Sequence, residues 1–320
     1  MQSAGLAEKR RFPVLQIPAG HSIMKRNIVR IMKLNRRPTM NSSEKKSLQI
    51  TACKIRMDAI EGVYHAKSGH PGGSLSAADL YAYLYFKEMN VNPEKPQDPD
   101  RDRFVLSKGH CCPGLYGALA ERGYFPREEM KTLRHVGSML QGHPNMNDTP
   151  GIDMSTGSLG QGVSAACGMA MAAKLDGKDY RVYAMLGDGE IEEGQVWEAA
   201  MFAAHKKLDN LCLIVDFNGL QIDGPVDEVA GPSPIDEKFR AFGFDVQVID
   251  GHDFDQIEAA FAHARTVKGK PCAIVAKTVK GKGVSFMENQ VGWHGSAPNA
   301  EQYQTAMEDL NKILAGLEAE

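Results

Sequence analysis

The stretch Tyr180–Gly224 decides the fold and reads YRVYAMLGDGEIEEGQVWEAAMFAAHKKLDNLCLIVDFNGLQIDG. Two short apolar runs, residues 181–186 and 211–217, are typical of buried parallel strands. Between them, residues 191–208 carry acids at the front, lysines at the back and apolar residues at helical spacing. The stretch therefore predicts a strand, a crossover helix and a second, parallel strand.

Polar residues follow both predicted strands. Asp188 lies in Gly187-Asp188-Gly189 after the first, and Asn218 follows the second, 30 residues later. Because the carboxyl ends of parallel strands share one ligand-binding edge, these side chains are expected to meet there. A carboxylate and an amide oxygen suit Mg²⁺, while the two glycines and the next helix N-terminus suit an anion. GDG alone is also an ordinary turn, but the spacing to Asn218 favours a magnesium diphosphate site.

Four histidines share one local pattern, in which the imidazole stands between small residues at the end of an element. They are His70 in SGHPGG, His110 in SKGH, His143 in QGHPN and His294 in GWHGS. One such turn is typical of a surface loop. Four beside a predicted phosphate site favour proton transfer and hydrogen bonding to sugar or phosphate oxygens. Zinc is the alternative, but no HExxH or Cys/His ligand spacing supports it.

The rest of the chain alternates helices and strands, which indicates an α/β fold with a three-layer parallel sheet covered by helices on both faces. Helices are expected over 42–67, 74–86, 113–122, 127–135, 156–174, 234–242 and 254–267, and strands over 104–106, 244–249 and 272–278. Ser42 or Ser43 is expected to cap the first helix. A last helix, with apolar positions from Tyr303 to Leu317, is amphipathic and needs a partner surface.

Composition fits a globular protein with one large domain, or two. The chain has 320 residues, 42% hydrophobic and 24% charged, with a net charge of −3. Residues 1–40 hold nine Lys or Arg and one acid, so the remainder is near −11, which argues against nucleic acid as a partner. We interpret residues 1–41 as a basic extension, either disordered or read from a start codon assigned too early; a transit peptide is the alternative. Residues 42–320 form the predicted domain.

Two further features bear on the compartment. No run approaches the roughly 18 apolar residues of a membrane span. Six cysteines follow no CxxC or regular spacing, as expected for reduced, mostly buried thiols in a cytoplasmic protein.

Several motifs resemble those of transketolases, in the same order. These are SGHPG, RFVLSKGH, GHP, STGSLGQGVSAACGMAMAAK, the GDG stretch and KGKGVSFMENQVGWHG, which together cover nearly everything from Ser42 to Pro298. GDG with Asn218 also resembles the thiamine diphosphate signature. The resemblance implies the thiamine diphosphate-binding fold of the diphosphate (PP) domain, with thiamine diphosphate and Mg²⁺, or Ca²⁺ or Mn²⁺, as cofactors.

The resemblance also implies roles for individual residues. The metal ligands are Asp188, Asn218 and the main-chain oxygen of Leu220; the diphosphate residues are Gly187, Gly189, His110 and His294. His143 holds the C1 hydroxyl of the two-carbon fragment, and His70 with His294 assists proton transfer at the donor's C3 hydroxyl. Gly157, Ser158 and Leu159 lie against the aminopyrimidine. Glu193 and Glu198 would otherwise only complement a helix dipole; the resemblance places Glu193 in a subunit interface linking paired active sites, and we group Glu198 with the cofactor residues.

The resemblance covers only half of a transketolase, whose second domain supplies the Glu that contacts the aminopyrimidine. We therefore expect the N-terminal subunit of a split transketolase, working with a C-terminal, pyrimidine-binding chain in a two-plus-two assembly. It would transfer a two-carbon ketol unit from a ketose phosphate to an aldose phosphate. PGGSLS and Lys108 differ from the residues usual in the family near the expected substrate channel. These differences put the usual pentose-phosphate substrates in doubt. The alternatives are another thiamine diphosphate enzyme, of the deoxyxylulose-phosphate synthase or 2-oxo acid dehydrogenase type, and a non-catalytic cofactor-binding protein.

Overall fold

The computed structural model describes residues 39–319. Contacts separate the chain into residues 1–38 and a compact unit over residues 39–320. The predicted basic extension, 1–41, lies outside the described residues except for its last three. Of these, Met40 donates its amide hydrogen to the Glu258 carboxylate at 2.9 Å. Asn41 caps the first helix through a capping box with Glu44, so neither Ser42 nor Ser43 is the cap.

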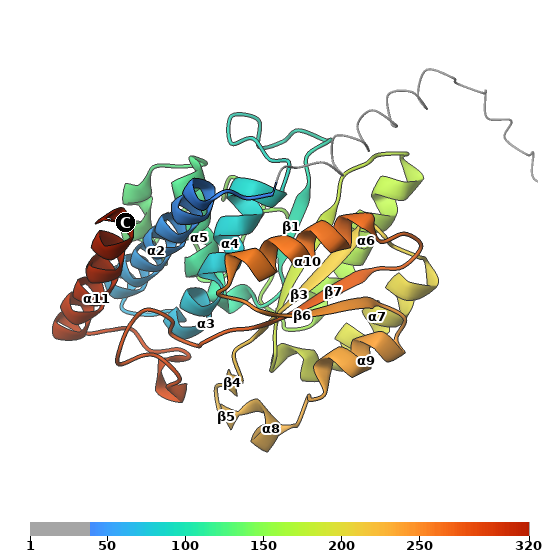
Figure 1. Cartoon of the computed structure of the whole chain (residues 1–320). Coiled ribbons are helices and arrows are strands. Elements are labelled where there is room, and N and C mark those ends of the chain that lie inside the picture. The colour runs from blue at the N-terminus through green and yellow to red at the C-terminus, as the bar shows by residue number, and fades with distance from the viewer. Residues whose placement is uncertain (1–38, 320) are drawn as a thin grey trace, which may run out of the picture. The chain divides into compact units, whose positions relative to one another are not determined.

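A five-stranded parallel sheet forms the centre of the unit, in the order β1-β2-β3-β7-β6 (Figure 1). Its strands are β1 Arg103–Leu106, β2 Val182–Gly187, β3 Leu211–Phe217, β6 Asp245–Asp250 and β7 Cys272–Lys277. The predicted apolar runs became strands to within a residue or two, because a parallel strand covered on both faces needs apolar side chains at successive positions. Gly187 of β2 is in register with Asp216 of β3, which brings the predicted site residues to neighbouring strand ends.

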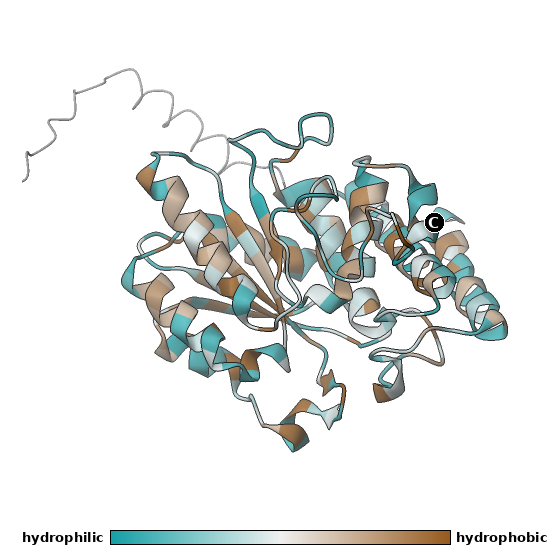
Figure 2. Ribbon diagram, turned by 180° about the vertical axis from the view of Figure 1, so that it is seen from behind, coloured by the Kyte–Doolittle hydropathy of each residue, from teal (hydrophilic) through white to brown (hydrophobic). Residues whose placement is uncertain are grey.

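Alternate residues of each strand enter different cores, which confirms the predicted three layers. Cys212 and Ile214 of β3 face one core, and Leu213 and Val215 face the other. The first core is built with α4 Ala78–Tyr83, α5 Cys112–Arg122 and α10 Phe254–Thr266, and the second with α6 Gln161–Leu175, α7 Gly194–His205 and α9 Ile235–Ala241. Figure 2 shows the apolar strands enclosed between helices with more polar outer faces.

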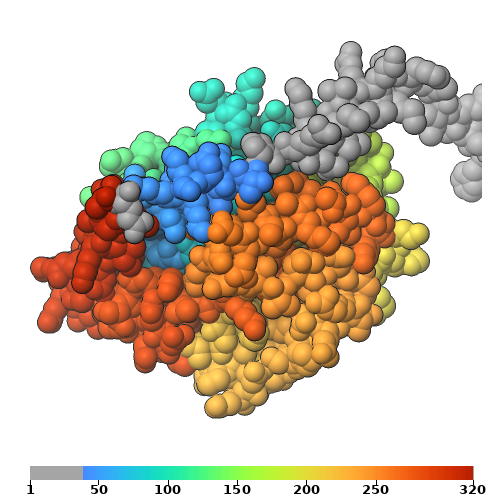
Figure 3. Space-filling view, viewed as in Figure 1, coloured from blue at the N-terminus to red at the C-terminus, as the bar shows by residue number. Residues whose placement is uncertain are grey.

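Two long helices add a further cluster beside the first core. Helix α2, Ser42–Ala66, packs against α11, Ala300–Ala319, and Tyr64 stacks on Tyr303 with 4.1 Å between ring centroids. The predicted amphipathic last helix thus finds its partner surface within the chain. The exposed side of α2 borders α10, to which Lys45 is joined by an ion pair with Asp255 (Figure 3).

Three predicted helices differ from the structure in their bounds or their type. The predicted helix over 74–86 is divided into α3 Pro71–Ser76, α4 and a π-helical turn, Leu84–Glu88. The predicted helix over 156–174 begins only at Gln161, because Gly157 and Gly160 adopt positive φ angles of 159° and 80°. The predicted helix over 127–135 is a 3₁₀ helix that ends at Thr132.

The elements within residues 39–319 that were not predicted are the hairpin strands β4 Leu220–Gln221 and β5 Gly224–Pro225, the short helix α8 Val226–Val229, and the 3₁₀ helices Gly109–Cys111 and Val291–Trp293. None of the helices within residues 39–319 has the length and hydropathy of a membrane span.

Candidate active site

A cavity of about 320 Å³ opens at the carboxyl ends of the strands. Nine residues predicted for the site line it: His110, Gly157, Leu159, Gly187, Asp188, Gly189, Asn218, Leu220 and His294. They come from segments far apart in the sequence, and the strand order brings these segments together. Parallel sheets bind ligands at this edge.

Three of the four predicted histidines form a cluster, of which His110 and His294 line the cavity and His70 lies against both of these rings. The ring centroids of His70 and His110 are 5.0 Å apart, those of His70 and His294 5.6 Å, and those of His110 and His294 5.2 Å. Burial lowers the pKa of His70 and of His110 to about 4, and that of His294 to about 3, with neighbouring cations adding to the effect. At neutral pH each ring is therefore uncharged, with one donor and one acceptor nitrogen. His70 Nδ1 is buried without a hydrogen-bond partner.

His143 occupies an adjoining groove, which it lines together with Arg134 and Gly142. The Arg134 guanidinium donates to Ser68 Oγ at 2.6 Å and to the Gly142 carbonyl at 3.3 Å, and so bridges the loops that carry His70 and His143. Burial, followed by the charge of Arg134, lowers the pKa of His143. The His143 ring lies next to Gly157, which lines the cavity: a Cβ placed on that glycine would be 3.2 Å from the ring.

Two of the predicted metal ligands, Asp188 and Asn218, directly follow β2 and β3, and the third, Leu220, begins the short strand β4. Asp188 is 3% exposed, and its carboxylate accepts from the amides of Gly189 at 2.9 Å and Gly219 at 2.5 Å. Burial raises the pKa of Asp188 to about 7, and the Asp216 carboxylate contributes. A bound cation would offset both effects and stabilise the charged form.

The donor atoms fit a hard cation such as Mg²⁺. Asn218 and Leu220 offer an amide and a main-chain oxygen beside the single carboxylate of Asp188, a set that leaves coordination sites for phosphate oxygens and water. Leu220 O accepts from Lys280 Nζ at 2.9 Å, and Asn218 Oδ1 accepts from the Leu220 amide at 3.2 Å. These oxygens therefore already face positively polarised groups.

The walls of the cavity also suit an anion. A Cβ on Gly189 would lie 2.8 Å from Gln221 Oε1 and 3.0 Å from Gln221 Cβ, so a larger residue here would have to displace the Gln221 side chain. Lys280 is 2% exposed, and its Nζ contacts Leu220 O and His294 Nδ1 at 2.9 Å each. None of the ion pairs found within residues 39–319 involves Lys280. A buried cation with this environment favours a negatively charged ligand.

Sequence reasoning missed Lys280 and Glu190 as site residues. Lys280 belongs to the KGKG motif and lies just after the strand predicted over 272–278, a position that could have indicated a residue at the ligand-binding edge of the sheet. Glu190 is buried, and its carboxylate accepts from the amides of Gly160 and Gly187 at 2.9 Å each, which joins the loop before α6 to the GDG turn. Lys108, expected near a substrate channel, is one of the residues that line the cavity, but it is buried and paired with Asp216.

The remaining predicted residues lie outside the main cavity. Ser158 lines a separate groove with Gln161 at the start of α6. Glu193 is the N-cap residue of α7 and Glu198 lies one turn into that helix; both are exposed. Within this chain the structure does not bring either glutamate to the cavity, so the cofactor role predicted for Glu198 has no contact here to support it.

Comparisons with known proteins agree with this geometry. The family model "Transketolase, thiamine diphosphate binding domain" matches residues 47–312. The chain is 47% identical to the 6-deoxy-6-sulfo-D-fructose transketolase subunit SqwG of Clostridium sp. (strain MSTE9), over 85% of this chain and 98% of that protein. It is 44% identical to one of the subunits of the apulose-4-phosphate transketolase of Phocaeicola vulgatus, over 86% of this chain and 98% of that protein.

Longer transketolases match over part of their length. The rat (Rattus norvegicus) transketolase is 44% identical over 78% of this chain and 40% of its own length. The crystal structure of the Campylobacter jejuni transketolase superposes with a TM-score of 0.78 at 35% identity, over 85% of this chain and 43% of that one. This chain thus spans less than half of these longer proteins and nearly all of the separate subunits. It belongs to the transketolase family, in which it corresponds to the N-terminal, thiamine diphosphate-binding subunit.

Proposed function

We propose that this chain binds thiamine diphosphate and a divalent cation in the cavity at the strand ends, and that with a second chain it transfers a two-carbon ketol unit between sugar phosphates. The observation that carries the proposal is that a predicted metal and phosphate site and a group of histidines line one cavity. The anion-binding turn at Asp188 and two rings of the neutral histidine cluster, His110 and His294, originate on different segments and line the same space, and His70 lies against both rings.

Each part of the cavity has a role in this proposal. Asp188, Asn218 and the Leu220 carbonyl hold Mg²⁺, for which Ca²⁺ or Mn²⁺ can substitute, and Gly187, Gly189, His110 and His294 receive the diphosphate. Gly157, Ser158 and Leu159 border the aminopyrimidine. When bound, thiamine diphosphate supplies the nucleophilic carbon and the electron sink needed to break a carbon–carbon bond. The protein supplies position, charge and proton transfer.

The histidines are suited to proton transfer because they are uncharged at neutral pH. We assign to His70 and His294 the acceptance and return of the proton of the donor's C3 hydroxyl, and the unpartnered Nδ1 of His70 supports this assignment. His143 receives the C1 hydroxyl from the adjoining groove. Their lowered pKa values keep all of them able to accept a hydrogen bond over the whole neutral range.

The second chain supplies the pyrimidine-binding half and the glutamate that contacts the aminopyrimidine. The match over 98% of two proteins named as subunits supports a separately encoded partner. Glu193 and Glu198 are exposed near the start of α7, where an adjacent chain can reach them, and we assign them to contacts across the two-plus-two assembly. All six cysteines are buried and unbridged, which supports a cytoplasmic location.

The test is two-carbon transfer from xylulose 5-phosphate to ribose 5-phosphate with thiamine diphosphate and Mg²⁺, for this chain alone and with the partner subunit. Because the relatives are named for different sugars, 6-deoxy-6-sulfofructose and apulose 4-phosphate are tested as further donors, and pyruvate tests the alternative enzyme types. We expect transfer only in the mixture, and its loss with Asp188→Ala. Transfer by this chain alone, or a preference for pyruvate, would contradict the proposal.

A further inference from the structure

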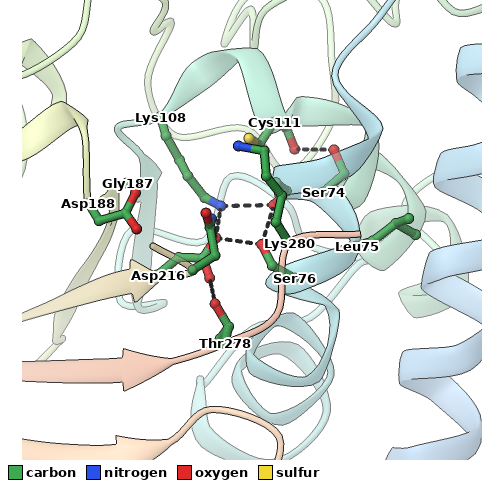
Figure 4. A network of polar contacts seen from close by, with 12 residues as sticks. Ser74, Leu75, Ser76, Lys108, Cys111, Gly187, Asp188, Asp216, Thr278 and Lys280 are labelled. Atoms are coloured by element: carbon green, nitrogen blue, oxygen red, sulfur yellow. Dashed lines mark hydrogen bonds and ion pairs between the residues drawn. The ribbon is translucent and has the colours of Figure 1, made fainter. Parts of the chain in front are cut away.

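A buried network of polar side chains lies directly beneath the proposed metal site. At its centre is Asp216, near the end of β3 and 0% exposed. Its carboxylate accepts from Lys108 Nζ at 2.5 Å, Ser76 Oγ at 2.6 Å, Asn218 Nδ2 at 3.3 Å and Thr278 Oγ1. Figure 4 shows Lys108, Ser76 and Thr278 converging on this carboxylate from different directions.

Each partner of Asp216 belongs to a segment that also carries a residue of the cavity. Ser76 ends the helix that follows His70, and Lys108 lies two residues before His110. Thr278 lies two residues before Lys280, and Asn218 is itself a proposed metal ligand. One carboxylate therefore connects four of the segments that line the cavity, to which the GDG turn and the loop before α6 are added.

The contact with Asn218 fixes which end of its amide faces the cavity. The oxygen and NH₂ ends have nearly the same shape, so packing alone discriminates poorly between them. A carboxylate can only accept, so Asp216 requires the NH₂ end. The Leu220 amide can only donate, so it requires the oxygen end. The two contacts agree, and the orientation they select directs the oxygen away from Asp216.

We propose that Asp216 is a positioning residue, which orients the Asn218 amide so that its oxygen is presented to the metal, and that Lys108 compensates the charge of Asp216. The inference rests on the proposed metal site. Asp216 lies in register with Gly187, next to Asp188, so two carboxylates are buried at adjacent strand ends. Lys108 neutralises one of them and leaves the other for the bound cation.

A purely stabilising ion pair would behave differently. Replacing a buried ion pair by apolar residues of similar size is often neutral or stabilising, because the desolvation of two ions is removed along with their attraction. The double variant Lys108→Met/Asp216→Leu is therefore expected to fold. It leaves no charge unpaired but removes the acceptor that selects the Asn218 orientation.

The experiment measures Mn²⁺ affinity of the full chain by electron paramagnetic resonance with thiamine diphosphate present, and thermal unfolding in parallel. We expect the double variant to lose about 10- to 100-fold in Mn²⁺ affinity, the range for residues that orient metal ligands. Lys108→Met/Asp216→Asn, which better preserves shape, serves if the first variant does not fold; an amide at 216 can accept from or donate to Asn218, so it no longer selects one orientation and should lower the affinity by a smaller factor. Glu88→Leu/Arg265→Met removes another buried ion pair, away from the cavity, and should leave affinity unchanged.

A rescue separates orientation from other effects. A carboxylate at position 218 has two equivalent oxygens and needs no orientation, so Asn218→Asp should restore Mn²⁺ binding in the double variant. In the wild-type background, where the amide is already oriented, the same change should raise Mn²⁺ affinity by much less than it does in the double variant.

The results distinguish this inference from the proposed enzyme activity. Wild-type Mn²⁺ affinity in the double variant, or no rescue by Asn218→Asp, would overturn the role of Asp216. A wild-type chain that binds no Mn²⁺ would overturn it together with the metal site. Absent ketol transfer with the expected Mn²⁺ pattern would instead refute the enzyme function and leave the positioning role standing.

Discussion

At the scale of single residues, burial determines the chemistry of the site. His70, His110 and His294 lie within 5.6 Å of one another by ring centroid, and burial is the largest cause of the lowered pKa of each. Three protonated imidazoles at this separation would repel one another in a poorly solvated space. The cluster is therefore a set of neutral bases and hydrogen-bonding groups, as expected of a site that moves hydroxyl protons.

His70 gives a prediction for the pH dependence of the reaction. The pH profile of kcat/KM reports the groups of the free enzyme. Because the pKa of His70 is lowered to about 4, the base form is present down to that pH, and the acidic limb should fall near pH 4 to 5 rather than at 6.5. His70→Asn should lower kcat by about 10²- to 10⁴-fold. An acidic limb at pH 6 to 7 that disappears in His70→Asn would contradict the burial argument.

At the scale of elements, a segment could be predicted where a local sequence pattern defines it, and could not where contacts with distant residues define it. Strands such as Leu211–Phe217 were predictable because continuous apolar runs of this length have few other uses in an α/β protein. The start of α6 was not, because the positive φ angles of Gly157 and Gly160 arise from the loop packing against the cavity. The same loop brings Leu159 into the site, so the error fell on a functional segment.

The buried charges were the least predictable part of the site. Asp188 and Asn218 were found because each follows an apolar run at a recognisable spacing. Asp216 lies inside such a run, and Lys108 lies in the SKGH motif, in which only His110 was predicted as a site residue. Their pairing depends on the parallel register of β2 and β3 and on the approach of β1, which no local pattern contains.

The contact between α2 and the 3₁₀ helix Arg127–Thr132 yields a stability prediction. Asp58 of α2 is 0% exposed, its Oδ1 pairs with Arg127, and its Oδ2 has no hydrogen-bond partner. Burial is the largest cause that raises the pKa of Asp58, from 3.8 to about 7. Between pH 3.8 and 7 the native state therefore holds a proton on Asp58 that the unfolded state has released. The free energy of unfolding falls as the pH rises through this range and the folded state loses that proton.

Asp58→Asn should remove this pH dependence. Urea unfolding at pH 5 and pH 8 measures it: the wild type should lose stability between the two, and Asp58→Asn should lose less. Glu44→Gln changes a half-exposed carboxylate on the same helix, whose pKa is lowered rather than raised by its hydrogen bond with Asn41, and as the control it should retain the wild-type difference. Equal pH dependence in the wild type and Asp58→Asn would show that the Arg127 pair, rather than burial, governs this carboxyl.

At the scale of the whole molecule, one helix surface remains uncovered. Met201 is 61% exposed and Phe202 41%, and both lie on α7, the helix that also carries Glu193 and Glu198. The other described helices do not cover this side of α7. Large apolar side chains exposed next to residues already assigned to a subunit contact indicate where another chain docks.

Met201→Glu should therefore weaken assembly. A charge introduced into the desolvated centre of an interface costs about 2 kcal/mol or more, so the assembled enzyme should dissociate into smaller species at micromolar concentration. Size-exclusion chromatography with light scattering measures this, and ketol transfer should fall as the enzyme is diluted. Val248→Glu places the same charge at a similarly exposed position on the edge strand β6 and should leave assembly unchanged. Dissociation by Val248→Glu but not by Met201→Glu would move the interface from α7 to the edge of the sheet.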